Sequence, residues 1–265
     1  MADSFEAATS LTRVAGDEHE LVVPDGWQQG RGAFGGLVLG AMLSAMIADE
    51  PDRSRVPRAF MGDICAPALP VAARLRTRAL RRGKNQSNLA CAFAQGGQIV
   101  AGSSAVLSAP RHAKGAPALA APPETGRFED VPVAPIGPPL GPVFARHYEY
   151  RVTNGVPFSG AKEAVVTGWV RERVPLTRVT YAALLARLDS FWPALYSVET
   201  APRPMATVSF MAELLRDPAT LDPEVPLFYR ARTVAEAVGY FVELRELWNG
   251  REPVALNQQC FAILG

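Results

Sequence analysis

Two stretches of the chain show strand-like alternation of hydrophobic and polar residues, and each also contains one segment with the pattern of a helix. The first stretch predicts a helix over 35–48, with strands at about 17–24, 58–66, 71–82, 87–96 and 98–109. The second predicts a helix over 177–189, with strands at about 144–152, 164–173, 204–215, 226–235, 239–248 and 253–263. The fold class indicated is α+β, as two fused units that each join one helix to an antiparallel sheet.

The first predicted helix is apolar on nearly every side from Leu37 to Ala48. A helix on a protein surface would keep one polar face. At about 1.5 Å per residue, this helix is also too short to cross a bilayer. A short helix buried on all sides and followed by antiparallel strands indicates a sheet that curls around it. A core helix that packs under an ordinary sheet is the alternative.

A proline-rich segment, residues 110–142, divides the two units and holds nine of the chain's 23 prolines. Proline lacks a backbone donor and blocks both helices and central strands, so we expect an ordered or semi-extended linker. The predicted units are therefore residues 1–109 and 143–265. Their last hairpins compare directly, because GQIVA at 97–101 and GREPVA at 250–255 both place glycine between two β-rich runs.

The composition argues against several classes of protein. A formal net charge of +1 gives no electrostatic reason to expect nucleic acid or an anionic membrane surface as a partner. The three cysteines show no spacing typical of disulfides or zinc sites, which favours a reducing compartment. No apolar run reaches the roughly 18 residues of a membrane span, and the first residues lack a secretory signal. We therefore expect a cytoplasmic protein.

Six short motifs are spread along the chain: RGAFGGLVLG at 31–40, LRRGK at 80–84, QGG at 95–97, LD at 188–189, ATV at 206–208 and VALNQQ at 254–259. Their order is the one found in TesB-like acyl-CoA thioesterases. The chain resembles this family, the acyl-CoA thioesterase II family, over nearly its whole length apart from the linker and residues 144–165. The resemblance implies a double hotdog fold and hydrolysis of acyl-CoA thioesters to free carboxylic acid and coenzyme A.

The resemblance also implies site residues. The catalytic Asp, Thr and Gln of the family correspond to Asp189, Thr207 and Gln259, which would orient the attacking water. No metal or separate cofactor is implied, since coenzyme A enters as part of the substrate. The chain departs from the family after Thr207, where it reads VSFMA without the histidines common in other members. This departure leaves the acyl group and the physiological substrate open.

The residues themselves suggest how the trio could work. Asp189 ends the second predicted helix beside Leu188 and Phe191, where the helix dipole and burial would both raise the pKa of a carboxyl group. Such a group suits a general base, whereas an exposed Asp in a turn is the alternative. Strand alternation is expected to place Thr207 on one face with Met205, Ser209 and Met211, and Gln259 on one face with Ala255, Phe261 and Ile263.

Two further groups are candidates for substrate binding. Gly35 and Gly36 open the first helix, where free N–H groups could stabilise the thioester oxygen as it becomes an oxyanion. Tight packing at a strand-to-helix turn is the alternative. Arg81, Arg82 and Lys84 cluster in one turn and could bind the phosphates of coenzyme A, or could simply be solvated.

Other functions stay open at this point. A hotdog dehydratase needs a catalytic histidine, and His19, His112 and His147 all lie away from the predicted central helices. A serine hydrolase lacks its G-x-S-x-G motif here. A non-catalytic protein that binds acyl-CoA or lipid is the main alternative. Because a hotdog sheet exposes edges and a broad face, we also expect a homodimer.

Overall fold

The computed structural model describes residues 4–111, 121 and 123–264. Its helices are α1 (Phe5–Ala8), α2 (Gly35–Ala48) and α3 (Tyr181–Asp189), with short 3₁₀ turns η1 (Phe128–Asp130), η2 (Val143–His147), η3 (Ala194–Ser197) and η4 (Pro218–Thr220). The strands of the first half are β1 (Thr12–Ala15), β2 (Glu18–Val22), β3 (Gln28–Gln29), β4 (Gly32–Ala33), β5 (Val56–Ile64), β6 (Ala72–Arg82), β7 (Gln86–Gln95) and β8 (Gln98–Ser108). Those of the second half are β9 (Tyr148–Asn154), β10 (Val165–Glu172), β11 (Met205–Leu214), β12 (Leu227–Ala237), β13 (Tyr240–Asn249) and β14 (Glu252–Ile263).

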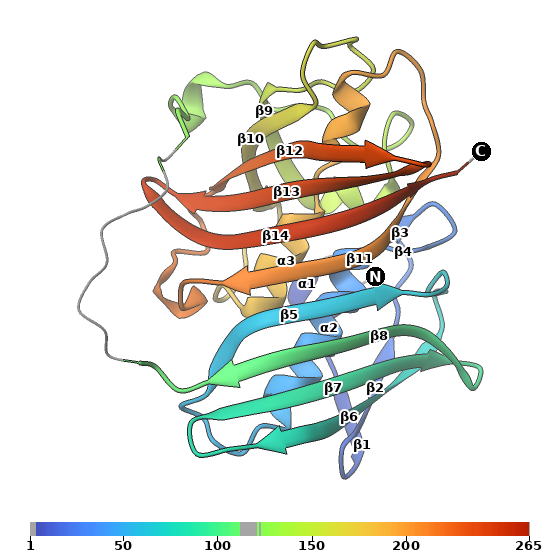
Figure 1. The fold of residues 1–265 in the computed structure, drawn as a ribbon, viewed down its shortest axis with the longest axis vertical. Coiled ribbons are helices and arrows are strands. Elements are labelled where there is room, and N and C mark those ends of the chain that lie inside the picture. The colour runs from blue at the N-terminus through green and yellow to red at the C-terminus, as the bar shows by residue number, and fades with distance from the viewer. Residues whose placement is uncertain (1–3, 112–120, 122, 265) are drawn as a thin grey trace.

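One antiparallel sheet runs through the described part of the molecule in the order β1-β2-β6-β7-β8-β5-β11-β14-β13-β12-β10-β9 (Figure 1). The order repeats outward from the central pair, so that β5, β8, β7, β6, β2 and β1 correspond to β11, β14, β13, β12, β10 and β9. The central pair is itself symmetric about Met61 and Met211, which face each other. The two halves of the chain therefore form one continuous sheet related by an approximate two-fold axis.

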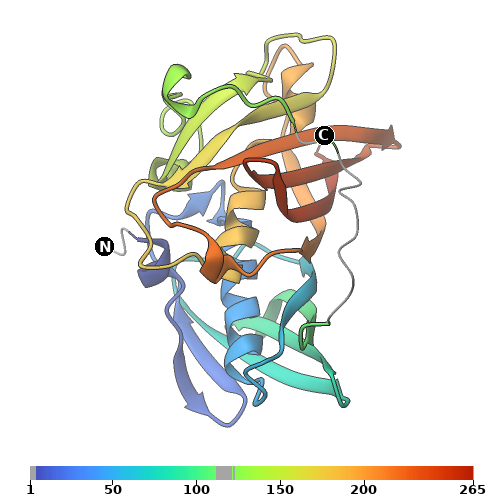
Figure 2. The same cartoon turned by 90° about the vertical axis from the view of Figure 1, so that its left-hand side faces the viewer.

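Helices α2 and α3 lie together on the concave side of this sheet, which curls around them (Figures 1 and 2). They run antiparallel, because Gly36 approaches Ala186 whereas Gly40 approaches Ala182. A Cβ atom on Gly36 would lie only 2.7 Å from the Ala186 Cα, so the close approach of the two helices requires glycine there. This packing brings the first turn of α2 against the last turn of α3.

The structure confirms the predicted α+β class and both predicted helices, with the strand boundaries shifted by a few residues. The residues of α2 from Gly35 to Leu43 are all buried, as its all-round apolar sequence predicted. Helix α3 begins later than expected because the Thr180 side chain accepts a hydrogen bond from the Ala183 N–H and caps it. The strand expected from residue 144 begins at Tyr148, since η2 precedes it.

The sequence patterns missed α1 and β1, which are four residues long. Part of the predicted linker, residues 112–120 and 122, lies outside the described residues. In the rest, Ala134 forms an isolated bridge with Tyr150 in β9, and its N–H donates to the Tyr150 carbonyl at 2.8 Å. The segment before β9 therefore contacts the second half, while the unit boundaries stay a prediction.

A polar cluster closes the C-terminal end of α2. Asp49 follows the helix and is only 8% exposed through its side chain. Its carboxylate accepts from Thr77 Oγ1 at 2.5 Å and from His19 Nε2 at 3.0 Å, and Arg13 also contacts it. Burial opposes the charge, but the hydrogen bonds from Thr77, His19 and Arg13 prevail and lower the pKa of Asp49.

We expect Asp49→Asn to lower the free energy of unfolding by about 2 kcal/mol at pH 7, because charge-assisted hydrogen bonds are lost. A carboxylate with a lowered folded-state pKa stabilises the fold above its unfolded pKa, and this contribution disappears as the pH falls through the folded value. The difference between wild type and variant should therefore shrink below about pH 4 in denaturant titrations. Asp17→Asn at an exposed neighbour should change little. A difference that persists at low pH would contradict this account.

Candidate active site

Three polar side chains from α3, β11 and β14 meet between the sheet and the helices. Gln259 is fully buried, and its Nε2 donates to Asp189 Oδ1 at 3.0 Å and to Thr207 Oγ1 at 2.8 Å. Asp189 is 8% exposed, and Thr207 is partly exposed. The structure thus gathers all three residues that the family resemblance indicated around one side-chain amide.

A β-bulge directs Thr207 to this cluster. Thr207 pairs with Phe261 and Ser209 with Cys260, so that Val208 is an extra residue in β11. The expectation that Thr207 shares a face with Met211 is therefore wrong, since one inserted residue reverses the alternation and Met211 is 40% exposed on the outer face.

Strand β14 follows its predicted alternation. Ala255, Gln259 and Phe261 are all buried on the inner face, as expected. The regular strand fixes the position of the Gln259 amide, while the bulge in β11 supplies the Thr207 hydroxyl.

Asp189 is enclosed by residues of the first half of the chain. A Cβ atom on Gly35 would lie 2.7 Å from Asp189 Oδ2, so the first turn of α2 packs directly against the carboxylate. Burial raises the pKa of Asp189, and this effect outweighs the opposing influence of Arg245, the Gln259 amide and the Gly36 N–H. The expected buried carboxyl group with a raised pKa is confirmed, and the alternative of an exposed turn residue is wrong.

The first turn of α2 offsets the unfavourable electrostatic effect of the C-terminal end of α3 on the Asp189 carboxylate. A carboxylate is disfavoured at a helix C-terminus, but the N-terminus of the antiparallel neighbour carries partial positive charge. The Gly36 N–H, which we expected to bind the thioester oxygen, lies near enough to Asp189 to lower the pKa of that carboxyl group. Its service as an oxyanion donor would require that N–H to be shared, and this role stays a prediction.

Two charged residues of the site escaped the sequence analysis. Arg245 on β13 is 1% exposed, and its Nη1 lies 3.7 Å from Asp189 Oδ1 and donates to the Leu188 carbonyl at 3.1 Å. Its Nε and Nη2 donate to Glu243 Oε2 at 3.1 and 3.0 Å. The sequence does indicate their burial, because strand alternation places Glu243 and Arg245 on the same face of β13 as the apolar Phe241 and Leu247.

The arrangement leaves specific hydrogen-bonding capacity for a small polar molecule. The Gln259 amide nitrogen is used twice, while its Oε1 is buried with no hydrogen-bond partner among the described residues. Thr207 Oγ1 accepts from Gln259, so its own hydroxyl proton can be donated elsewhere. A carboxylate acceptor, a hydroxyl donor and a free amide acceptor can together hold one water molecule.

The predicted phosphate-binding turn lies at the other end of α2. Arg82 Nη2 donates to the Asp49 carbonyl at 3.1 Å, and its Nε lies 3.7 Å from Glu50 Oε2. The backbone carbonyl of Lys84 accepts from Arg55 at 3.1 Å, and Arg81 is exposed. The structure does not bring this turn to the trio, since α2 alone spans about 20 Å. A role of these residues in binding coenzyme A stays a prediction.

The described histidines are engaged elsewhere. His19 contacts Asp49 just after α2, so the expectation that it lies away from the central helix is wrong. His147 Nε2 lies 2.9 Å from the Gly26 carbonyl, and its ring stacks on Trp27. His112 lies outside the described residues. Neither histidine in the described part hydrogen-bonds to the trio.

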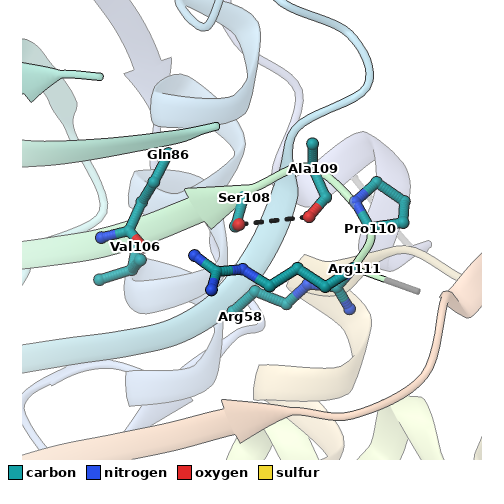
Figure 3. A pocket seen from close by; sticks show the side chains of 7 residues that line it. All are labelled: Arg58, Gln86, Val106, Ser108, Ala109, Pro110 and Arg111. Atoms are coloured by element: carbon teal, nitrogen blue, oxygen red, sulfur yellow. Dashed lines mark hydrogen bonds between the residues drawn. The ribbon is translucent and has the colours of Figure 1, made fainter. Parts of the chain in front are cut away.

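Two cavities in the described part are lined by other residues. One of about 410 Å³ lies over the end of β8, where Arg58 and Arg111 run along the groove near Ser108 (Figure 3). The other, of about 390 Å³, is lined by residues that include Asp49 and Thr77.

Within the described residues, no group of three or more His, Cys, Asp or Glu side chains could hold a metal ion. No helix there has the length and apolar character needed to cross a membrane.

The equivalent position in the first half lacks the amide of Gln259. Phe210 lies opposite Gln259 in the second half, and Phe60 lies opposite Ala105 in the first. The two-fold relation therefore places a methyl group where the second half carries Gln259. This supports one trio per chain, in the second half.

Solved structures share this fold over nearly the whole chain. A conserved protein of unknown function with a hot dog fold from Alicyclobacillus acidocaldarius is 26% identical, with a TM-score of 0.89 and 98% of each chain covered. The tesB protein MAP1729c of Mycobacterium avium subsp. paratuberculosis is 14% identical, with a TM-score of 0.81 and the same coverage. An acyl-CoA thioesterase II, TesB2, from Mycobacterium marinum is 16% identical, with a TM-score of 0.78 and 98% of each chain covered. These likenesses confirm the double hotdog fold.

Sequence comparison with family models identifies both halves. No curated protein sequence matches the chain. The model of the acyl-CoA thioesterase N-terminal domain matches residues 23–108, and that of the acyl-CoA thioesterase C-terminal domain matches residues 116–263. The antiparallel helices, the buried trio and strands β3 to β14 lie within these matched ranges. The chain belongs to the acyl-CoA thioesterase family.

Proposed function

We propose that this thioesterase hydrolyses acyl-CoA by attack of a water molecule held by Asp189, Thr207 and Gln259. The observation that carries the proposal is the Gln259 amide, whose nitrogen donates to both the Asp189 carboxylate and the Thr207 hydroxyl and so holds these two groups close together. Each group then has a separate task, because the carboxylate accepts, the hydroxyl donates and the amide orients. The trio needs no histidine to perform them.

The proposed reaction begins with transfer of a proton from water to the Asp189 carboxylate. The resulting hydroxide attacks the thioester carbonyl carbon, and the carbonyl oxygen becomes an oxyanion that a backbone N–H at the start of α2 can stabilise. The tetrahedral intermediate collapses with cleavage of the C–S bond. Asp189 then returns its proton to the thiolate of coenzyme A, and the free carboxylic acid leaves. A raised pKa brings Asp189 closer to the working pH, which favours both proton transfers.

The wider setting of the enzyme is also proposed. A fatty acyl group is the substrate class that the family resemblance suggests, and the cytoplasm is the expected compartment.

A homodimer is supported by the broad outer face of the sheet, where Met61 and Met211 are 48% and 40% exposed at its centre. Sedimentation velocity would measure that assembly, and a monomer at micromolar concentration would contradict it.

We expect the wild-type protein to release thiol from acyl-CoA substrates, with a preference that a panel of acyl groups will reveal. The panel should contain straight chains of increasing length and aromatic acyl groups, and release can be followed with a thiol-reactive dye. A heat-denatured sample gives the uncatalysed rate. Binding without release from any member would contradict the proposal and favour the alternative, a hotdog protein that binds acyl-CoA or lipid without catalysis.

A further inference from the structure

The inner face next to Gln259 carries a pair of charges that the fold itself does not need. Glu243 lies directly opposite Gln259 across β13 and β14, and Arg245 lies one step further along the same face. Their exposed fractions are 0% and 1%. The desolvation penalty of a buried ion pair commonly exceeds its Coulombic gain, so such a pair demands a reason other than stability.

The first half of the chain provides an internal comparison. Its equivalent strand, β7, places Leu89 opposite Ala105, and Cys91 follows two residues later on the same face. Leu89 and Cys91 therefore stand where the second half carries Glu243 and Arg245. The first half therefore forms the same fold with apolar side chains at both positions. This indicates that the fold does not require an ion pair there.

Arg245 connects the strand to the end of α3. Its Nη1 donates to the Leu188 carbonyl at 3.1 Å and lies 3.7 Å from Asp189 Oδ1. Glu243 holds the opposite edge of the guanidinium, and its Oε1 accepts from the Leu195 N–H at 3.3 Å. The guanidinium is thus fixed on both sides, and one of its nitrogens faces the same oxygen that Gln259 contacts.

Few other charges face Asp189. Tyr148, Tyr150 and Tyr229 lie near it, but burial raises the pKa of each hydroxyl, so all three are neutral at physiological pH. Arg187 on α3 is paired with Glu172 of β10 at 2.5 Å between Nη2 and Oε2. Arg245 is therefore the cation in direct contact with the Asp189 carboxylate among the described residues.

We propose that Arg245, fixed by Glu243, is a positioning residue for thioester hydrolysis that keeps Asp189 ionised and aimed at the attacking water. This proposal rests on the proposed function of the trio. A guanidinium stays charged at every working pH, so it favours the carboxylate form against the cost of burial. Without it, burial would hold Asp189 in the protonated form over a wider pH range, and the protonated form cannot accept a proton from water.

The test replaces the pair with the kind of side chains that the first half uses. Glu243→Leu/Arg245→Met removes both charges together and leaves no unpaired ion in the core, so the fold should persist. We expect kcat/KM at pH 7 to fall at least about tenfold and the acid limb of its pH profile to move up by about one unit or more. Arg245→Lys keeps the charge but not the planar fork, so it should lower kcat while leaving the acid limb near its wild-type position.

The matched control is Glu172→Leu/Arg187→Met, which removes the other buried ion pair at the same helix. Thermal unfolding checks that both double variants are folded, and the control should leave the acid limb unchanged. The infrared band of the Asp189 carboxyl group, defined as the band that Asp189→Asn deletes, reports its protonation without substrate. Its midpoint should move up in Glu243→Leu/Arg245→Met only.

An unchanged acid limb and infrared midpoint in Glu243→Leu/Arg245→Met would overturn the proposal, even with a slower rate. An equal shift in both double variants would overturn it as well, because the effect would then come from any buried pair. A wild-type protein that releases no thiol would overturn the proposed function, and with it the role of Arg245 in hydrolysis. The infrared titration distinguishes this outcome from a failure of the Arg245 proposal itself, because it measures without substrate whether Arg245 keeps Asp189 ionised.

Discussion

Asp189→Asn is expected to lower kcat for acyl-CoA hydrolysis by about a thousandfold, within the range that general base catalysis contributes. Asparagine keeps the size of the side chain and an oxygen that accepts from the Gln259 amide, so the packing between α2 and α3 should survive. It cannot take a proton from water. Affinity for a non-hydrolysable acyl-CoA analogue should therefore stay close to that of the wild type, and the loss should lie in turnover.

The measurement compares steady-state thiol release with analogue binding in the same preparations. Asp63→Asn is a suitable control, because it makes the same chemical change on the exposed face of β5, and it should retain wild-type turnover. Retention of more than about a tenth of the activity by Asp189→Asn would remove the carboxylate from the role of base. Binding without turnover in the wild type would instead favour a non-catalytic protein.

Gly35→Ala should lower kcat by about a hundredfold although it adds a single methyl group, because small displacements of a catalytic group cost about that much. The new Cβ would stand 2.7 Å from Asp189 Oδ2 and 3.1 Å from Ile64 Cδ1, so the carboxylate must move. Alanine favours helices more than glycine does, so the variant should not lose stability through its backbone. The effect should fall on the reaction rather than on folding.

Gly102→Ala serves as the control for Gly35→Ala, since nothing lies within 4 Å of the Cβ that it would add. A double-mutant cycle gives a sharper result. In the Asp189→Asn background, Gly35→Ala should cause little further loss of turnover, because both changes act through the same carboxylate. Independent, additive losses would show that the methyl group harms the enzyme by another route.

The regular parts of the fold follow from local patterns. Alternation placed β5 to β8 and β10 to β14 within a few residues, because one face of each strand is buried and the other is exposed. The apolar run from Leu37 to Ala48 predicted a buried helix for the same reason. Short α1 and β1 were missed, since four residues give too little periodicity to recognise.

The features that build the site depend on contacts between distant parts of the chain. The face of Thr207 was mispredicted because a bulge at Val208 reverses the alternation, and nothing in the local sequence announces it. The contact of the first turn of α2 with Asp189 was not predicted, because it arises from the antiparallel packing of α2 on α3. Arg245 was missed because its partner lies in a helix more than fifty residues earlier in the chain.

The contact between Gly35 and Asp189 has a kinetic consequence. Gly35 belongs to the first half and Asp189 to the second, so the second half alone would hold the trio without the turn of α2 that encloses its carboxylate. In a hotdog enzyme made of two separate chains, dilution would part the halves and turnover per chain would fall with concentration. Here the covalent connection keeps the effective concentration of one half near the other high and constant. The junction between Gly35 and Asp189 should therefore give each chain a specific activity that does not fall on dilution.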